Sequence, residues 1–198
     1  MNDLRRDVVI VRHGATVWSE SRQHTGRTDI ALTLVGEAEA RALRTALTAL
    51  AGGHNVHAFT SPLLRARMTC QLAAPEMVDV RVDDDLAEYD YGDYEGKTSA
   101  EIHRARPDWE IFRDGCPGGE SPSQVTARCD RFIARIATLE GAVFVFTHGH
   151  LSRFLAARLL GLAGSDGRVL WNNTGSYAVV RTDTDRDTVL VAWNVRSR

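Results

Sequence analysis

The chain has 198 residues, of which 43% are hydrophobic and 25% are charged, and its formal net charge is −2 at pH 7. This composition is typical of a globular protein with a sizeable core, and it excludes a disordered or strongly polarised chain. The arginines are scattered among acidic residues without a basic stripe, so we expect no nucleic-acid partner. The length favours a single domain over residues 1–198.

The cysteines and the hydropathy pattern bear on the cellular compartment. Cys70, Cys116 and Cys129 are widely spaced and form no Cys-x-x-Cys pair, which predicts neither a disulfide framework nor a zinc knuckle. The amino-terminal residues contain no apolar signal core, and no stretch approaches the length that spans a membrane. We therefore expect a cytoplasmic protein that has no membrane partner.

The first predicted element is a strand that ends in reactive side chains. Four β-branched apolar residues occupy positions 8–11 and run directly into Arg12, His13 and Gly14. An apolar run without alternation is typical of a strand that is covered on both faces, as in a parallel sheet. Ligands of open α/β sheets bind beyond the carboxyl ends of the strands, so Arg12 and His13 are expected to border a crevice.

The first half of the chain then alternates between helices and strands. A polar, aperiodic loop is expected over residues 18–30, and its length suggests a functional role. A capped amphipathic helix is predicted over 33–52 and a short strand over 56–60. A second helix is expected to start at the Ser-Pro pair that opens the range 61–75, and a third strand covers 78–82.

The second half of the chain repeats the alternation after an unusual loop. Residues 86–96 contain three tyrosines, four carboxylates and two glycines, which predicts a surface loop. A short helix is expected over 99–106, and a capping box begins a longer one that ends near 141. Residues 143–146 form a second uninterrupted apolar strand, followed by a further helix. Strands over 177–181 and 189–195 are predicted to form an antiparallel hairpin.

This order of elements predicts an α/β fold: a three-layer α/β/α sandwich with a mostly parallel central sheet and an antiparallel edge hairpin. Right-handed crossovers direct successive strand ends to one rim of such a sheet. Four strand ends would therefore deliver five titratable or cationic side chains to that rim, namely Arg12 and His13, Arg65, Glu88, and His148.

The residue types on this rim indicate a phosphate site. Guanidinium groups match phosphate oxygens in paired hydrogen bonds, so Arg12 and Arg65 are expected to bind a dense anion. His148 would hold the transferring phosphoryl group. Helix N-termini near Ser61 and Gly149 are expected to add backbone donors directed at the same ligand.

Two of the rim residues are candidates for chemistry rather than binding. Neighbouring positive charge disfavours an imidazolium, so His13 beside the two arginines should stay neutral, with a ring nitrogen free to attack phosphorus. Glu88 would carry the proton, first as an acid toward the leaving oxygen and then as a base toward water.

These residues resemble the motifs of the histidine phosphatase superfamily, which is also called phosphoglycerate mutase-like. The resemblance covers nearly the whole chain. It implies that His13 becomes a phosphohistidine, that Arg12, Arg65 and His148 bind the phosphoryl oxygens, that Glu88 donates the proton, and that no metal or organic cofactor is needed. The motifs that carry it are Arg12-His13-Gly14, residues 25–33, residues 61–66, residues 86–92 with Glu95-Gly96, and Thr147-His148-Gly149.

One position departs from the family pattern. The family often has an asparagine after the Thr-x-Trp segment, whereas here Ser19 follows Trp18. A serine hydroxyl can donate a hydrogen bond to phosphate, but its reach is shorter. Ser19 is therefore one candidate phosphate ligand, and Thr25 with the backbone of Gly26 forms the alternative lining of the pocket.

The sequence favours a hydrolase over a phosphotransferase. Mutases of the family are longer and carry a basic insertion after the acid-bearing loop, whereas Glu88 is followed directly by tyrosines and acidic residues. The chain resembles most the small acid phosphatases of the branch once labelled mutases. We therefore predict a phosphomonoester hydrolase acting on a small phosphorylated molecule, with a phosphoglycerate mutase-type phosphotransferase as the alternative.

Two further alternatives come from other classes of protein. A metallohydrolase could use His148, His150 and the carboxylates of residues 90–95, but Arg12 and Arg65 would repel a cation. A non-catalytic protein that binds a phosphorylated ligand would not need a nucleophile and an acid together. The sequence leaves open whether the chain forms a homodimer.

Overall fold

A six-stranded mixed sheet forms the centre of the molecule in the computed structural model, which describes residues 6–53, 55–77, 79–183 and 186–197. The strand order is β3-β2-β4-β1-β5-β6, with parallel pairing from β3 to β1 and antiparallel pairing of β5 and β6. The predicted fold class is therefore confirmed. The strands are β1 (Arg6–Arg12), β2 (Val56–Thr60), β3 (Val80–Val82), β4 (Ala142–Thr147), β5 (Tyr177–Asp183) and β6 (Arg186–Val195).

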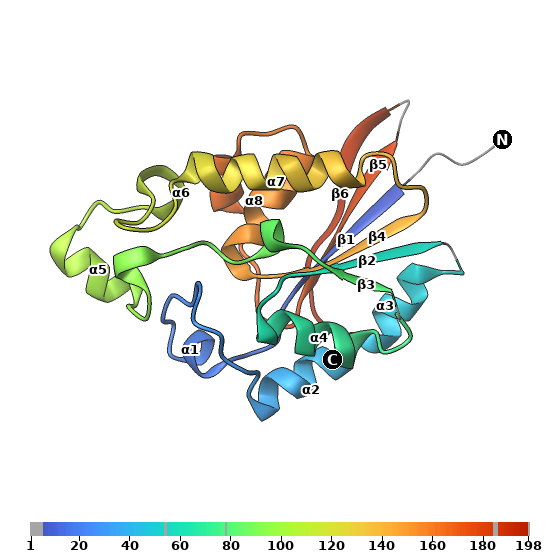
Figure 1. The fold of residues 1–198 in the computed structure, drawn as a ribbon, viewed down its shortest axis with the longest axis horizontal. Helices are drawn as coiled ribbons and strands as arrows, with labels where there is room; N and C mark the ends of the chain where they lie inside the picture. Colours follow the sequence, from blue (N-terminus) through green and yellow to red (C-terminus); the bar gives the residue numbers. More distant parts are fainter. Residues whose placement is uncertain (1–5, 54, 78, 184–185, 198) are drawn as a thin grey trace.

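Helices cover both faces of this sheet (Figure 1). Val9 and Val11 pack toward one helical layer, whereas Val8 and Ile10 pack into the core cluster on the other face. This two-sided burial explains why the opening strand shows no polar alternation. One layer consists of α2 (Leu34–Ala42), α3 (Arg44–Ala51) and α4 (Leu64–Ala73), and the other of α7 (Pro122–Ile136) and α8 (Gly149–Leu159).

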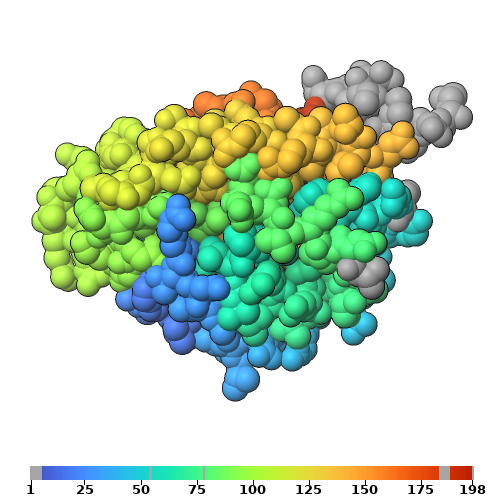
Figure 2. Space-filling view, viewed as in Figure 1, coloured from blue at the N-terminus to red at the C-terminus, as the bar shows by residue number. Residues whose placement is uncertain are grey.

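Shorter elements extend beyond the carboxyl ends of the parallel strands (Figure 1). Here the N-terminal loop pairs with a later segment, because His24 N–H donates to Lys97 O at 2.9 Å and Gln23 Nε2 donates to Gly96 O at 2.7 Å. The blue N-terminal segment accordingly lies against the green one in the space-filling view (Figure 2). These elements are α1 (Val17–Glu20), α5 (Ser99–Ala105), α6 (Ile111–Asp114) and the 3₁₀ turns η1 (Asp84–Leu86), η2 (Gly92–Tyr94) and η3 (Gly164–Val169).

The element boundaries differ from the prediction in three places. The expected loop over 18–30 begins with the helical turn α1, and the expected helix over 33–52 is divided into α2 and α3 at Leu43. The Ser61–Pro62 pair does not start α4, because Leu63 is still extended and the helix begins at Leu64.

Other predicted boundaries agree with the structure. Ser121 and Gln124 form the predicted capping box at the start of α7. The predicted C-terminal hairpin is present as β5 and β6, although its turn residues 184–185 lie outside the described residues, as does Val78 of the expected third strand. In the part of the chain that the structure describes, no helix combines the length and apolar character needed to cross a membrane.

A close backbone contact fixes the turn after β1 against the first turn of α2. A Cβ atom on Gly36 would lie 2.0 Å from Ala15 O, and one on Gly14 would lie 2.2 Å from Gly36 O. Both neighbouring atoms belong to the backbone, so side-chain rotation cannot relieve the overlap. The turn that carries the predicted nucleophile thus depends on glycine at both positions.

We therefore expect Gly36→Ala to lower the free energy of unfolding by about 1 to 3 kcal/mol, as overpacking of a rigid contact does. The measurement is urea denaturation followed by circular dichroism. Val35→Ala is the matched control, since Val35 lies one residue earlier in the same helical turn and is 58% exposed. Equal stability of the two variants would contradict this account of the contact.

Candidate active site

The carboxyl ends of β1 and β4 bring two predicted site histidines together. The strands are adjacent and parallel, with Arg12 in register with Thr147, so His13 and His148 leave the sheet side by side. Their ring centroids are 5.2 Å apart at an interplanar angle of 61°. The backbone N–H of His13 also donates to Thr147 O at 3.0 Å, which joins the two turns directly.

The environment of His13 leaves one ring nitrogen with a free electron pair. Its Nδ1 lies 2.7 Å from Gly14 O, and because a carbonyl oxygen only accepts, the ring proton belongs on Nδ1. Burial, followed by the charges of Arg65 and Arg12, lowers the pKa of His13 well below its usual value. The imidazole is therefore neutral near pH 7, and its Nε2 carries the lone pair.

Arg65 is fully buried in the first turn of α4, where backbone carbonyls fix its guanidinium. Its Nη2 donates to Thr25 O and Gly26 O, both at 2.9 Å, and its Nη1 donates to Thr28 O at 3.0 Å. The loop that supplies these carbonyls is held by Glu95, which accepts from the N–H groups of Gly26 at 2.9 Å and Thr28 at 3.0 Å. The predicted residues Thr25 and Gly26 thus orient Arg65.

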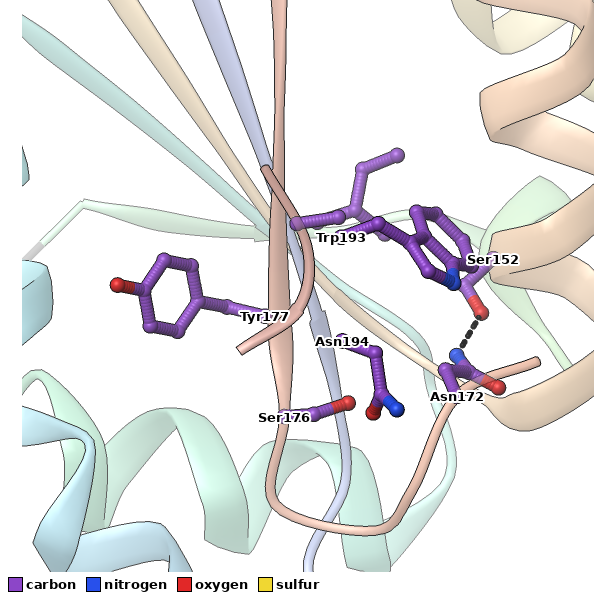
Figure 3. A pocket seen from close by; sticks show the side chains of 8 residues that line it. Ser152, Asn172, Ser176, Tyr177, Trp193 and Asn194 are labelled. Atoms are coloured by element: carbon purple, nitrogen blue, oxygen red, sulfur yellow. Dashed lines mark hydrogen bonds between the residues drawn. The ribbon is translucent and has the colours of Figure 1, made fainter. Parts of the chain in front are cut away.

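Arg12 is held by the segment that follows η3. Its Nη1 donates to Asn172 O at 2.7 Å, and Asn172 Nδ2 donates to Ser152 Oγ on α8, also at 2.7 Å. Figure 3 shows Asn172 and Ser152 facing one another beside a small hollow, which none of the five predicted catalytic residues lines. A Cβ on Gly149 would lie 3.1 Å from Arg12 Cζ, so the predicted residue Gly149 permits the close approach of the guanidinium.

Glu88 follows η1 and lies at the N-terminus of α8. One carboxylate oxygen accepts from the N–H groups of Tyr89 and Leu151, both at 2.9 Å, and the other accepts from His150 N–H at 3.1 Å. The first amides of α8 were expected to face the ligand, but two of them bind Glu88. The helix terminus therefore orients the predicted acid, which is 7% exposed.

Three buried nitrogen atoms of the predicted site residues have no hydrogen-bond partner among the described residues: Arg12 Nε, Arg65 Nε and His148 Nδ1. The hydroxyl of Tyr89, next to Glu88, is also buried without a partner there. Burial and the charge of Arg65 also lower the pKa of His148 well below its usual value. Buried polar groups normally have partners, and guanidinium nitrogens are strong donors to anions. Together these groups can bind an anion with several oxygens next to His13.

Ser19 has a local role in the structure. Its hydroxyl donates to Thr16 O at 2.9 Å and accepts from Thr16 N–H at 2.8 Å, which completes the capping box of α1. Both hydrogen bonds lie within one turn, so the serine shapes the start of the N-terminal loop. A contact of Ser19 or Thr25 with phosphate stays a prediction.

Three supporting residues were not recognised from the sequence. Ser61 bonds to His148 through its hydroxyl, whereas the sequence indicated a helix N-terminus whose backbone donors would face the ligand; its own N–H donates to Phe146 O instead. Glu95 was part of a motif, but apart from the metallohydrolase alternative it had no assigned role. Asn172 lies in an irregular segment without a local signal, and its contact with Arg12 spans 160 positions.

Two of the carboxylates proposed for a metal site, those of Asp90 and Glu95, are engaged elsewhere. Asp90 accepts from Arg27 Nε at 2.5 Å, and Glu95 binds backbone amides. His150 pairs through Nδ1 with Tyr91 Oη at 2.6 Å. Within the described ranges, no group of three or more His, Cys, Asp or Glu side chains is arranged to hold a metal ion. These contacts disfavour the metallohydrolase alternative.

Aromatic and imidazole rings pack next to Glu88. The ring centroid of His24 lies 4.7 Å from that of Tyr91, and the ring of His150 lies 5.6 Å from that of Phe112. Burial, with a smaller effect of His103, lowers the pKa of His24 to about 4. The cluster therefore contains histidines that are neutral in the folded protein.

The rim of an α/β sheet thus holds a neutral imidazole, an adjacent carboxyl group and buried anion donors, which defines a site for phosphoryl chemistry. A family model described as the histidine phosphatase superfamily (branch 1) matches residues 8–196. The chain belongs to this superfamily. The family predicted from the sequence is confirmed.

Individual relatives agree with this assignment. The chain is 42% identical to sedoheptulose 1,7-bisphosphatase of Saccharomyces cerevisiae, over 82% of this chain and 70% of that protein. It is 35% identical to an acid phosphatase of Mycobacterium tuberculosis, over 87% and 84% of the two chains. The solved structure of open reading frame Rv3214 from the same organism matches with a TM-score of 0.89 and 30% identity, over 98% of this chain and 99% of that chain.

Relatives named 2,3-bisphosphoglycerate-dependent phosphoglycerate mutase also match, for example that of Methylobacterium radiotolerans at 34% identity over 92% of both chains. These relatives are less similar to the chain than the two named phosphatases. The enzyme class predicted from the sequence, a phosphatase of the histidine phosphatase superfamily, is confirmed, and the mutase alternative is not favoured.

The low pKa of His24 predicts that the fold loses stability in acid. An unfolded histidine takes up a proton as the pH falls through its usual value of 6.5, whereas native His24 does so only near 4. The contribution of neutral His24 to the free energy of unfolding is therefore fully present above pH 6.5, and it is lost as the pH falls from 6.5 to about 4. From about pH 7.5 to about pH 5, His24 should account for a loss of about 1 to 2 kcal/mol.

The measurement is the free energy of unfolding in urea at both pH values, for the wild type and for His24→Gln. The variant should lose less stability on acidification, since glutamine does not titrate. If both proteins lose the same amount, the neutral state of His24 contributes nothing to acid sensitivity.

Proposed function

We propose that the protein is a phosphomonoester hydrolase that works through a phosphohistidine on His13, with Glu88 as the general acid and base. The observation that carries this proposal is the set of buried nitrogen atoms without a partner, Arg12 Nε, Arg65 Nε and His148 Nδ1, beside an imidazole whose lone pair is free. These donors fit the oxygens of a phosphoryl group and its developing charge.

In the first step, Nε2 of His13 attacks phosphorus, and the bond between phosphorus and the ester oxygen breaks. The leaving oxygen takes the proton of the Glu88 carboxyl group, so the alcohol departs neutral. The guanidinium groups of Arg12 and Arg65 and the ring of His148 hold the transferring phosphoryl oxygens. The Gly14 carbonyl keeps the His13 ring oriented by accepting the Nδ1 proton.

In the second step, water attacks the phosphorus of the phosphohistidine while the Glu88 carboxylate takes a proton from it. The phosphorus–nitrogen bond breaks, its electron pair returns to Nε2 of His13, and inorganic phosphate is released. Glu88 is again protonated, so the cycle is complete. The site residues supply all these roles themselves, and the scheme uses no metal or organic cofactor.

The leaving-group side supports hydrolysis of a small phosphorylated molecule. After Glu88 the chain continues with buried Tyr89 and Tyr91, whereas a mutase must grip a second acidic group with additional cations. The relatives named as a bisphosphatase and an acid phosphatase support the same class of substrate. We place the reaction in the cytoplasm, which agrees with three buried cysteines in the free form.

Trapping the intermediate tests the nucleophile. During turnover of a ³²P-labelled monoester we expect acid-sensitive, base-stable label on the protein, and we expect His13→Ala to abolish both the label and activity. His57→Ala is the matched histidine control, because His57 lies near the amino-terminal end of β2, whereas the site lies at the carboxyl ends of the strands. With 3-phosphoglycerate as substrate, release of inorganic phosphate without formation of the 2-phospho isomer supports the hydrolase. Label on the His13 variant would disprove the assignment.

The role of Glu88 as the acid predicts a dependence on the leaving group. Glu88→Gln should reduce kcat/KM by about 10²- to 10⁴-fold for an alkyl phosphate, and by much less for p-nitrophenyl phosphate, since a good leaving group departs without a proton. Asp93→Asn, an exposed carboxylate of the same loop, is the matched control. Equal losses for the two substrates would mean that another group donates the proton.

A further inference from the structure

Ser61 occupies a buried position between two groups that define the direction of its hydrogen bonds. Its Oγ lies 2.7 Å from His148 Nε2, and it accepts from Leu63 N–H at 3.2 Å. Both Ser61 and His148 are fully buried. The backbone N–H of Ser61 donates to Phe146 O at 2.9 Å, so the serine is anchored to β4, the strand that leads into His148.

The chemistry of these groups assigns the proton of the His148 ring. A backbone N–H only donates, so the hydrogen of the Ser61 hydroxyl remains free to be donated to Nε2. The opposite arrangement would leave that hydrogen without an acceptor, since the structure places no other acceptor against it in the described chain. A neutral imidazole that accepts at Nε2 carries its hydrogen on Nδ1.

We infer that Ser61 is a positioning residue, which fixes His148 in the tautomer whose Nδ1–H donates a hydrogen bond to the transferring phosphoryl group. This inference rests on the proposed function. Nδ1 is the ring atom that is buried without a partner, so the donor it carries is available to a ligand. The other tautomer would present a lone pair to an anionic oxygen and repel it.

The same tautomer in His13 and His148 gives the two rings opposite roles. In His13 the Gly14 carbonyl accepts the Nδ1 proton, so the free atom is Nε2 with a lone pair, which suits a nucleophile. In His148 the Ser61 hydroxyl donates to Nε2, so the free atom is Nδ1 with a proton, which suits an anion donor. The low pKa of His148 keeps this ring neutral, so its tautomer decides what it can bind.

Tautomers can be read directly from two-bond ¹H–¹⁵N correlation spectra of protein labelled with ¹⁵N-histidine. In the wild type we expect His148 to show a protonated Nδ1 and an unprotonated Nε2, with its signals assigned by their loss in His148→Gln. In Ser61→Ala we expect them to shift toward the averaged values of mixed tautomers, while the His13 signals keep their pattern. A protonated Nε2 in the wild type would overturn the inference, and this measurement needs no variant of Ser61.

The expected kinetic consequence is a loss in kcat rather than a rise in KM. Ser61→Ala should lower kcat about 10- to 100-fold with little change in KM, less than the removal of a direct donor to the transition state costs. Ser61→Thr keeps the hydroxyl and should restore most of the activity. Thr126→Val, which removes the hydroxyl that bonds to Pro122 O within α7, should keep wild-type kcat.

Two kinetic results would also contradict the role of Ser61: unchanged kcat in Ser61→Ala, or a threonine variant as slow as the alanine variant. The spectra are recorded on the resting enzyme without substrate. A correct tautomer together with failed labelling of His13 would therefore reject the proposed mechanism alone, whereas successful labelling together with a protonated Nε2 would reject the role of Ser61 alone.

Discussion

The parallel pairing of β1 with β4 is the constraint on which the rest of the site depends. Val8 to Arg12 lie in register with Val143 to Thr147, and both strands are covered by helices on both faces. The two His-Gly turns therefore start from a rigid base that is buried from solvent, and His13 and His148 have little freedom to separate. Such a base fixes catalytic groups more precisely than flexible loops do.

Buried positive charge is the second condition of the site. The described residues include no salt bridge from Arg12 or Arg65 to a carboxylate, and carbonyl oxygens hold both guanidinium groups. Removing cations from water is costly unless a counter-charge is present, so these buried guanidinium groups favour an anion. Burial, together with these charges, disfavours protonation of His13 and His148. In the proposed mechanism the same arginines bind phosphate and, with burial, help to keep the His13 imidazole neutral.

The sequence was sufficient for features that depend on local patterns. The uninterrupted apolar runs before His13 and His148 predicted both buried strands, and the alternation of helices and strands predicted their common edge. Contacts between distant segments were not accessible in this way. Nothing near Asn172 indicates that its carbonyl holds Arg12, and a Ser-Pro pair predicts a helix cap regardless of whether Ser61 also meets a histidine.

The backbone donors at the N-terminus of α8 bind Glu88, which leaves side-chain donors for the ligand. The amides of His150 and Leu151 bind the carboxylate of Glu88, so they orient the proposed acid instead of the ligand. Anion binding then falls to side chains, and the glycine that opens the helix leaves room for Arg12 to approach. A side-chain donor must have its hydrogen on the correct atom, which a backbone amide always has. This requirement makes the hydroxyl of Ser61 important for His148, because a neutral imidazole binds an anion only from its protonated nitrogen.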